Sequence, residues 1–117
     1  MEYRRFSDTY VVRLDRGEEV IGSIEELCER EGIKLGWVNA IGAVGEATLG
    51  YFDTSLKQYF SRQYTGIYEI ASLSGNISTK DGKPYLHIHA VLSGEDGIAV
   101  GGHLNRAVVS ATCEAFI

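Results

Sequence analysis

Residues 85–104 read YLHIHAVLSGEDGIAVGGHL, the pattern of two β-strands joined by a tight turn. His87 and His89 are two positions apart in the first strand, so their side chains share one face, about 7 Å apart along the backbone. If the turn centres on Asp96, His89 pairs with His103, since each lies seven positions from Asp96. Directly opposed residues share a face of the sheet. The hairpin therefore predicts all three histidine side chains on one patch.

These three residues are all the histidines of the chain. Three neutral imidazoles, each with its nitrogen about 2.0–2.1 Å from the metal, form a common zinc site with a fourth coordination position open. We predict that His87, His89 and His103 bind zinc or another divalent transition metal, and that Gly101 and Gly102 let the backbone approach the ion. Two alternatives stay open. The histidines could contact only one another or water, or a one-residue slip in register could send His103 to the other face.

A few other side chains are candidates for the same site. Glu69 and Asn76 lie in a long strand-like segment that we expect beside the histidine strand. Either could act as a base, as a fourth ligand or as a partner of a ligand. No nucleophile is expected, because Ser110, Thr112 and Cys113 have no base that the sequence reveals.

Two classes of function fit these residues. A metal-binding module that holds a partner protein or a small ligand is favoured over an enzyme, because no catalytic pair is evident. The alternative is a metalloenzyme of the hydrolase or lyase type acting on a small molecule. In that case a His-ligated zinc would activate water, and Glu69 would be the best candidate for the base.

The rest of the chain contains one helical pattern among strand patterns. Residues 9–15 alternate with period two, which indicates a strand. Residues 17–31 place apolar side chains on one face of an amphipathic helix and glutamates on the other, with Gly32 as the expected end. Further strand-like runs cover residues 37–44, 46–53, 57–62, 67–78, 98–100 and 107–117.

These elements predict an α+β fold, with a mostly antiparallel sheet of about six or seven strands flanked by one main helix. The 14 glycines and single proline fit a chain with many tight turns. A second short helix within residues 33–45 is an alternative for that segment. We expect one domain over residues 1–117. One helix can cover one face of the sheet, so we expect self-association to cover the other.

The charge distribution argues against a nucleic-acid or membrane surface. The chain has 11 Lys and Arg against 16 Asp and Glu, a net charge of −5. Residues 17–32 hold six Glu and one Arg, so the remainder of the chain is neutral overall. No segment forms a basic stripe of the kind that neutralises phosphates. Direct binding to nucleic acid or to an anionic membrane is therefore not expected.

Cysteine usage and the N-terminal sequence indicate a cytoplasmic protein. Cys28 and Cys113 are too few for a disulfide framework, and each falls in an expected apolar position, so we predict buried free thiols in a reducing compartment. The N-terminal residues have no apolar signal core, and no run is long enough to span a membrane.

Several stretches together resemble the PPC domain, the "plants and prokaryotes conserved" family. In the C-terminal half they are SLSGNIS (72–78), KPYLHIHAVLSGEDG (83–97), GGHL (101–104) and VSATCEAFI (109–117). RLDRGEE (13–19) and AIGAVGEATLGYFD (40–53) are similar to its N-terminal half. The resemblance covers nearly the whole chain.

The resemblance implies a mostly antiparallel sheet flanked by helices and assembled as a homotrimer. It also implies a stand-alone prokaryotic type, some members of which carry a metal at a histidine cluster. Residue by residue, that cluster falls on His87, His89 and His103. In plants the domain follows AT-hook motifs that grip the DNA minor groove, and the domain itself serves trimer formation and partner contact.

The chain departs from the plant pattern in two motifs. It has no AT-hook, so a DNA-binding or regulatory role would follow from the family name alone. The plant partner-contact motif Gly-Arg-Phe-Glu-Ile-Leu corresponds to Gly66–Ala71, where Ile67 replaces the arginine and Ala71 the leucine. Members of the family usually run further than Ile117, so we expect either a short member or a missing tail.

Overall fold

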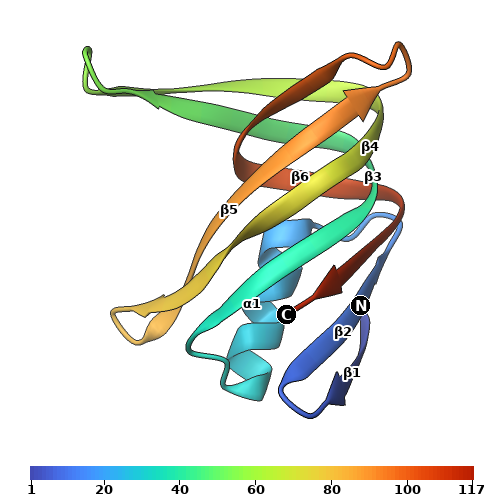
Figure 1. Ribbon diagram of the computed structural model, residues 1–117, viewed down its shortest axis with the longest axis vertical. Helices are drawn as coiled ribbons and strands as arrows, with labels where there is room; N and C mark the ends of the chain where they lie inside the picture. The colour runs from blue at the N-terminus through green and yellow to red at the C-terminus, as the bar shows by residue number, and fades with distance from the viewer.

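A computed structural model describes residues 1–117 as one antiparallel sheet of six strands with a single helix (Figure 1). The predicted α+β class is confirmed. The elements, in chain order, are β1 (Glu2–Phe6), β2 (Thr9–Asp15), α1 (Val20–Glu31), β3 (Gly36–Asp53), β4 (Gln58–Lys80), β5 (Lys83–Gly94) and β6 (Ala99–Phe116).

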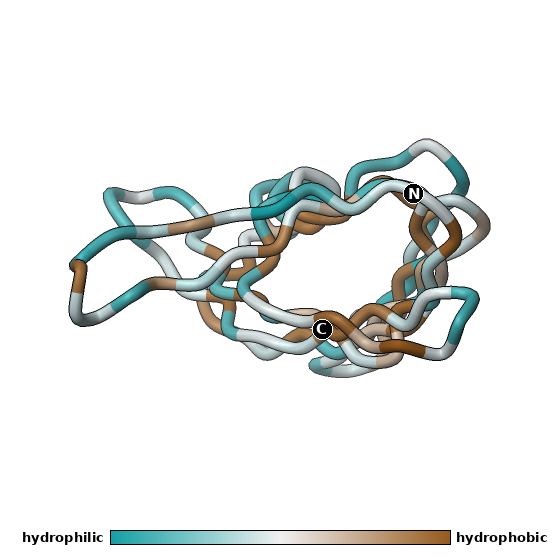
Figure 2. The backbone as a smooth tube through the Cα atoms, turned by 90° about the horizontal axis from the view of Figure 1, so that it is seen from above, coloured by the Kyte–Doolittle hydropathy of each residue, from teal (hydrophilic) through white to brown (hydrophobic).

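The sheet curls until part of it closes on itself. Its strand order is β1-β2-β6-β3-β4-β5, and β5 also pairs with β6. Strands β3 to β6 therefore form a closed ring in which each strand pairs with two of the others. Seen from above, the backbone surrounds the core as a flattened ring (Figure 2). The closing contact joins His89–Ser93 of β5 to Ala99–His103 of β6, so these segments have no free strand edge between them.

The core lies inside this curled sheet and under α1. It consists of 23 buried residues, all hydrophobic, and no polar or charged residue is buried. Alternation with period two explains the contribution of β3, where Val38 and Ala40 are buried while Trp37 and Asn39 are exposed. The same alternation rules out a helix within residues 33–45, because these residues from Gly36 onward belong to β3.

Helix α1 covers the end of the ring that the strands leave open, where it contacts β5 and β6. The Glu19 carboxylate caps its N-terminus by accepting hydrogen bonds from the amides of Ile21 (3.1 Å) and Gly22 (2.7 Å). It also accepts one from the amide of Ala107 in β6 (3.0 Å), which ties helix to sheet. Gly32 ends the helix in the left-handed conformation, as predicted. The buried side chains of the helix are Val20, Ile24, Leu27 and Cys28.

Several runs that the sequence separates are single bent strands. The runs 37–44 and 46–53 both belong to β3, and 57–62 and 67–78 both fall almost entirely in β4. Bulges make the bends, with the first shift in the β3–β4 register between Ala40 and Gly42. Gly42 has φ 153°, and a Cβ there would lie 2.3 Å from the carbonyl oxygen of Thr112. Only glycine fits this bend.

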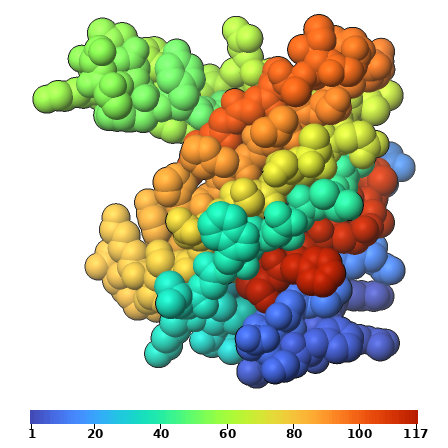
Figure 3. All heavy atoms as spheres, in the orientation of Figure 1, coloured from blue at the N-terminus to red at the C-terminus, as the bar shows by residue number.

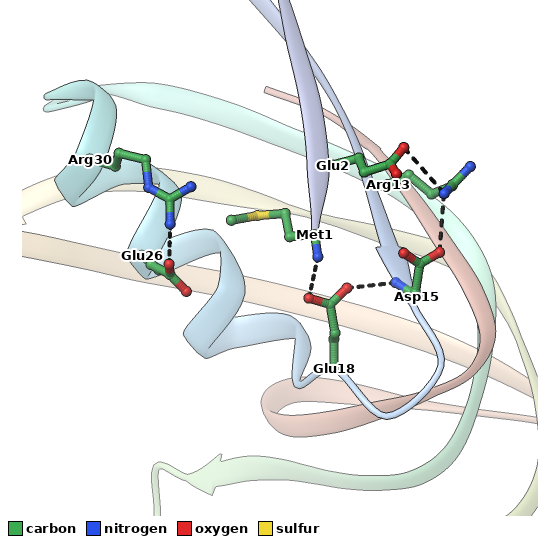
Figure 4. Close-up of polar contacts among 7 residues, drawn as sticks. All are labelled: Met1, Glu2, Arg13, Asp15, Glu18, Glu26 and Arg30. Atoms are coloured by element: carbon green, nitrogen blue, oxygen red, sulfur yellow. Dashed lines mark hydrogen bonds and ion pairs between the residues drawn. The ribbon is translucent and has the colours of Figure 1, made fainter.

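Strand β1 was not predicted from the sequence, and polar contacts hold it in place (Figure 4). Arg13 of β2 pairs with Glu2 of β1 (3.2 Å) and with Asp15 (3.1 Å). The Glu18 carboxylate contacts the amino group of Met1 and accepts a hydrogen bond from the amide of Asp15 (2.7 Å). On α1, Arg30 pairs with Glu26 one turn earlier.

Two surface features bear on function. The hairpin between β3 and β4 projects far from the body (Figures 1 and 3). On the outer face of the sheet, Trp37 and Ile41 of β3 and Phe116 of β6 are each more than half exposed.

No helix of the structure has the length and apolar character needed to cross a membrane.

Candidate metal centre

The three histidines come from two neighbouring strands. His87 and His89 lie on β5, and His103 lies on β6. The register between these strands pairs His89 with His103, as the turn centred on Asp96 predicts. The alternation of β5 and the register of the hairpin are thus sufficient to place all three rings on the outer face of the sheet.

The rings converge closely enough to share one ion. The Nε2 atoms of His87 and His89 are 3.3 Å apart. Two nitrogens bound to one tetrahedral zinc ion at about 2.05 Å lie about 3.3 Å apart. The ring centre of His103 lies 5.2 Å from that of His87 and 5.6 Å from that of His89. One ring nitrogen from each residue can be chosen so that all three lie within 4.8 Å of one another.

The surroundings of His103 favour its neutral imidazole, the form that binds metal. His87 and His89 are exposed, and His103 is partly buried. Burial lowers the pKa of His103, and the nearby His87 and His89 rings lower it further. The lowered pKa reduces the competition between protons and a metal ion for His103.

A hollow of about 470 Å³ opens in front of the three rings. The far wall comes from the projecting β3–β4 hairpin, beneath which the surface is visibly indented (Figure 3). Apart from the histidines, its lining residues are Gly50, Tyr51, Phe52, Tyr59 and Gly102. None of them is charged.

Tyr59 is a site residue that sequence reasoning missed. Its ring meets the ring of His103 edge-on, with centres 6.2 Å apart. Its hydroxyl donates a 2.6 Å hydrogen bond to Oδ1 of Asn105, two residues beyond His103. In the sequence this tyrosine is one of many that are typical of core and interface positions. The structure places it at the site, because Tyr59 of β4 lies next to His103 and Asn105 of β6.

Gly50 and Gly102 allow strands β3 and β6 to lie close together at the site. Gly50 of β3 pairs with His103 of β6. A Cβ on Gly102 would lie 2.6 Å from the carbonyl oxygen of Gly50, a backbone atom that cannot move aside. Gly102 is therefore required for β6 to pass this close to β3, and that close passage holds His103 at the hollow.

Of the other two predicted candidates, Glu69 lies away from the histidine cluster and Asn76 lies beside it. Glu69 is exposed on β4 and lies opposite Ser93 of β5. The β4 residue opposite His89 is Ser74, five positions further along the strand. That spacing corresponds to about 16 Å along the strand. Asn76 lies opposite His87 on the same face and has no hydrogen-bond partner from the cluster.

The hydroxyl and thiol candidates also lie elsewhere. Thr112 donates a hydrogen bond to Glu114 (2.7 Å), remote from the histidines in the β6 register. Burial raises the pKa of the Cys113 thiol to about 11, with a smaller contribution from Glu114. Cys28 is buried as well, and burial raises its pKa to about 11. Both cysteines are buried free thiols, as predicted.

Comparison with solved structures finds close relatives of this fold. The metal-containing protein AF0104 of Archaeoglobus fulgidus is 43% identical, with a TM-score of 0.88, and the match covers 98% of this chain and 80% of that one. A plant- and prokaryote-conserved protein of Pyrococcus horikoshii is 39% identical, with a TM-score of 0.88 and coverage of 98% and 78%. A candidate DNA-binding protein of Bacteroides thetaiotaomicron is 32% identical, with a TM-score of 0.96 and coverage of 98% and 80%.

No curated protein matches the sequence. The family model of the Plants and Prokaryotes Conserved (PCC) domain matches residues 1–117. This agrees with the resemblance carried by the histidine hairpin and the flanking motifs. The chain therefore belongs to the Plants and Prokaryotes Conserved domain family.

Proposed function

We propose that the protein is a metal-binding module that holds one divalent transition metal ion, zinc in the first instance, on His87, His89 and His103. The observation that carries the proposal is the convergence of the three rings, above all the 3.3 Å between the Nε2 atoms of His87 and His89. The metal content of the Archaeoglobus relative supports it. When bound, the ion supplies a Lewis-acidic centre with one open coordination position.

A binding role is favoured over hydrolysis or elimination. A zinc hydrolase needs a base within hydrogen-bond reach of the metal-bound water. The hollow has no carboxylate in its lining, and Glu69 lies about 16 Å along the sheet from the register of His89. The metalloenzyme remains the alternative function. If an activity is found and Glu69→Gln leaves its turnover unchanged, Glu69 is not the base of that reaction.

Elemental analysis of protein purified without chelator tests the metal site. We expect about one equivalent of metal per chain, and loss of most of it in His89→Ala and in His103→Ala. Ser74→Ala is the matched control, because Ser74 lies opposite His89 on β4 and is no ligand in the proposal. Less than a tenth of an equivalent in the unaltered protein after incubation with zinc would overturn the proposal.

We further propose that the chain assembles as a homotrimer. Trp37, Ile41 and Phe116 expose large apolar surface on adjacent strands of the outer face, which favours burial against other copies. Light scattering should give a mass of about three times the 12.9 kDa of one chain. A stable monomer at micromolar concentration would contradict this assembly.

DNA binding is not part of the proposal. The net charge of −5 and the neutral charge balance outside residues 17–32 supply no phosphate-neutralising stripe. A gel-shift experiment over a salt titration would reveal the contrary case, since tight and steeply salt-dependent binding would show that the charge argument is wrong.

A further inference from the structure

We propose that the hollow in front of the histidines binds a small monocarboxylate with a flat apolar body. Its carboxylate would take the open position of the metal, and its body would lie against the aromatic wall of the β3–β4 hairpin. The inference rests on the proposed metal site and extends it to a class of ligand. Three features of the hollow carry it.

The first feature is the wall. Tyr51, Phe52 and Tyr59 line the hollow and keep 62%, 57% and 43% of their surface exposed. Phe52 and Tyr59 are cross-strand partners in the hairpin, so their side chains share the face that looks onto the hollow and form an exposed apolar surface there. The side chain of Tyr51 lies on the opposite face, where it stacks on Phe60 with ring centres 5.5 Å apart and planes at 25°. A flat apolar group fits such a wall, because aromatic faces and edges pack well on one another.

The second feature is charge. The three imidazoles are neutral ligands, so a bound divalent ion keeps its two positive charges in the site. No Asp or Glu lines the hollow to balance them, which favours an anion. No Lys or Arg lines it either, so a phosphate or a nucleotide would lack the donors that phosphates need. A carboxylate is the anion that best suits this combination.

The third feature is space. The hollow of about 470 Å³ falls in the range of small-molecule sites, about 300–1,000 Å³. A Cβ on Gly50 would lie 2.0 Å from the hydroxyl oxygen of Tyr59, so this glycine leaves room for the Tyr59 ring at the side of the hollow.

Cobalt(II)-loaded protein and benzoate provide the test, because cobalt absorption reports a change in coordination. We expect benzoate to perturb the spectrum and to bind about tenfold tighter than acetate, since aromatic contacts favour the larger anion. Benzyl alcohol, which lacks the carboxylate, should bind at least about tenfold weaker than benzoate. Calorimetry on metal-free protein should show no benzoate binding.

Substitutions then locate the wall. Phe52→Ala should bring the affinity for benzoate down towards that for acetate while leaving cobalt affinity unchanged. Leu56→Ala is the matched control, because Leu56 is an exposed apolar residue of the same hairpin outside the hollow. Thermal unfolding of both variants confirms that they fold.

The two proposals fail in different ways. Equal affinities for benzoate and acetate, or a Phe52→Ala variant that binds benzoate as the unaltered protein does, would overturn the ligand inference while the metal site stands. A chain that takes up no cobalt would overturn the metal site first and the ligand inference with it.

Discussion

His89 of β5 lies directly opposite His103 of β6, and this register decides whether the chain has a three-histidine centre at all. With it, His103 faces outward beside His87 and His89. Leu104, the next residue on β6, points into the core, where it is buried. A shift of one residue would exchange His103 and Leu104, which would bury an imidazole and expose a leucine. The burial of Leu104 therefore fixes the register that brings the three histidines together.

Metal binding should weaken as the pH falls. Each imidazole must be neutral to bind, and free histidine titrates at about 6.5. Because burial and its two neighbours lower the pKa of His103, this ligand stays available below that value. Cobalt titrations from about pH 8 to about pH 5 should show most of the loss below about 6.5. Cobalt affinity that stays constant over this range would show that imidazoles are not the ligands.

The features that the sequence predicts correctly are local ones. The register of His89 and His103 follows from one turn, and the end of α1 follows from Gly32. Strand β1 was missed because Arg4 and Arg5 interrupt its apolar pattern, and its residues are stabilised by pairing with β2.

The features that were missed depend on contacts between distant segments. The closure of the ring, in which β5 and β6 meet after β3 and β4 have curled, arises from bulges such as that at Gly42. The place of Tyr59 beside His103 depends on the same curl, since 44 positions separate them in the chain. The hydrophobic periodicity of the sequence predicts neither the closure of the ring nor the position of Tyr59.

Gly102→Ala should destabilise the ring and the site together. The added Cβ would lie 2.6 Å from the Gly50 carbonyl oxygen, so β6 must move away from β3. We expect a loss of about 1–3 kcal/mol in the free energy of unfolding, measured by urea denaturation, and weaker metal binding. Gly45→Ala is the control, since its nearest neighbour would be Ser110 Cβ at 3.6 Å. Equal stability of the two variants would contradict this account of Gly102.

The two cysteines should resist alkylation in the folded protein. Cys28 and Cys113 are both about 1% exposed, and burial raises the pKa of each thiol to about 11, so little thiolate forms at neutral pH. A thiol reagent should label neither cysteine in native buffer and both in denaturant, as counted by mass spectrometry. Rapid labelling of native protein would show that this part of the core opens readily.

Glu31 should make stability depend on pH in the acid range. Its carboxylate accepts hydrogen bonds from the hydroxyls of Tyr3 (2.8 Å) and Tyr10 (3.1 Å), which lower its pKa in the folded state. The stabilisation is therefore present above the unfolded value of about 4.3 and is lost as the pH falls through the lower folded value. Glu31→Gln should flatten the pH dependence of the melting temperature in this range. If the pH dependence of the melting temperature is the same in Glu31→Gln, Glu31 is not the group that causes it.

A charge on the outer face should dissociate the proposed trimer without unfolding the chain. Ile41 is 57% exposed in a single copy, so Ile41→Glu adds a surface carboxylate at little cost to the fold. Burying that carboxylate between copies would be costly, because it would have no partner there. Light scattering should then give a smaller mass than for the unaltered protein, with an unchanged circular dichroism spectrum. Leu56→Glu at the tip of the β3–β4 hairpin is the control, and it should remain assembled. Dissociation by Leu56→Glu alone would place the contact on the projecting hairpin in place of the Trp37, Ile41 and Phe116 surface.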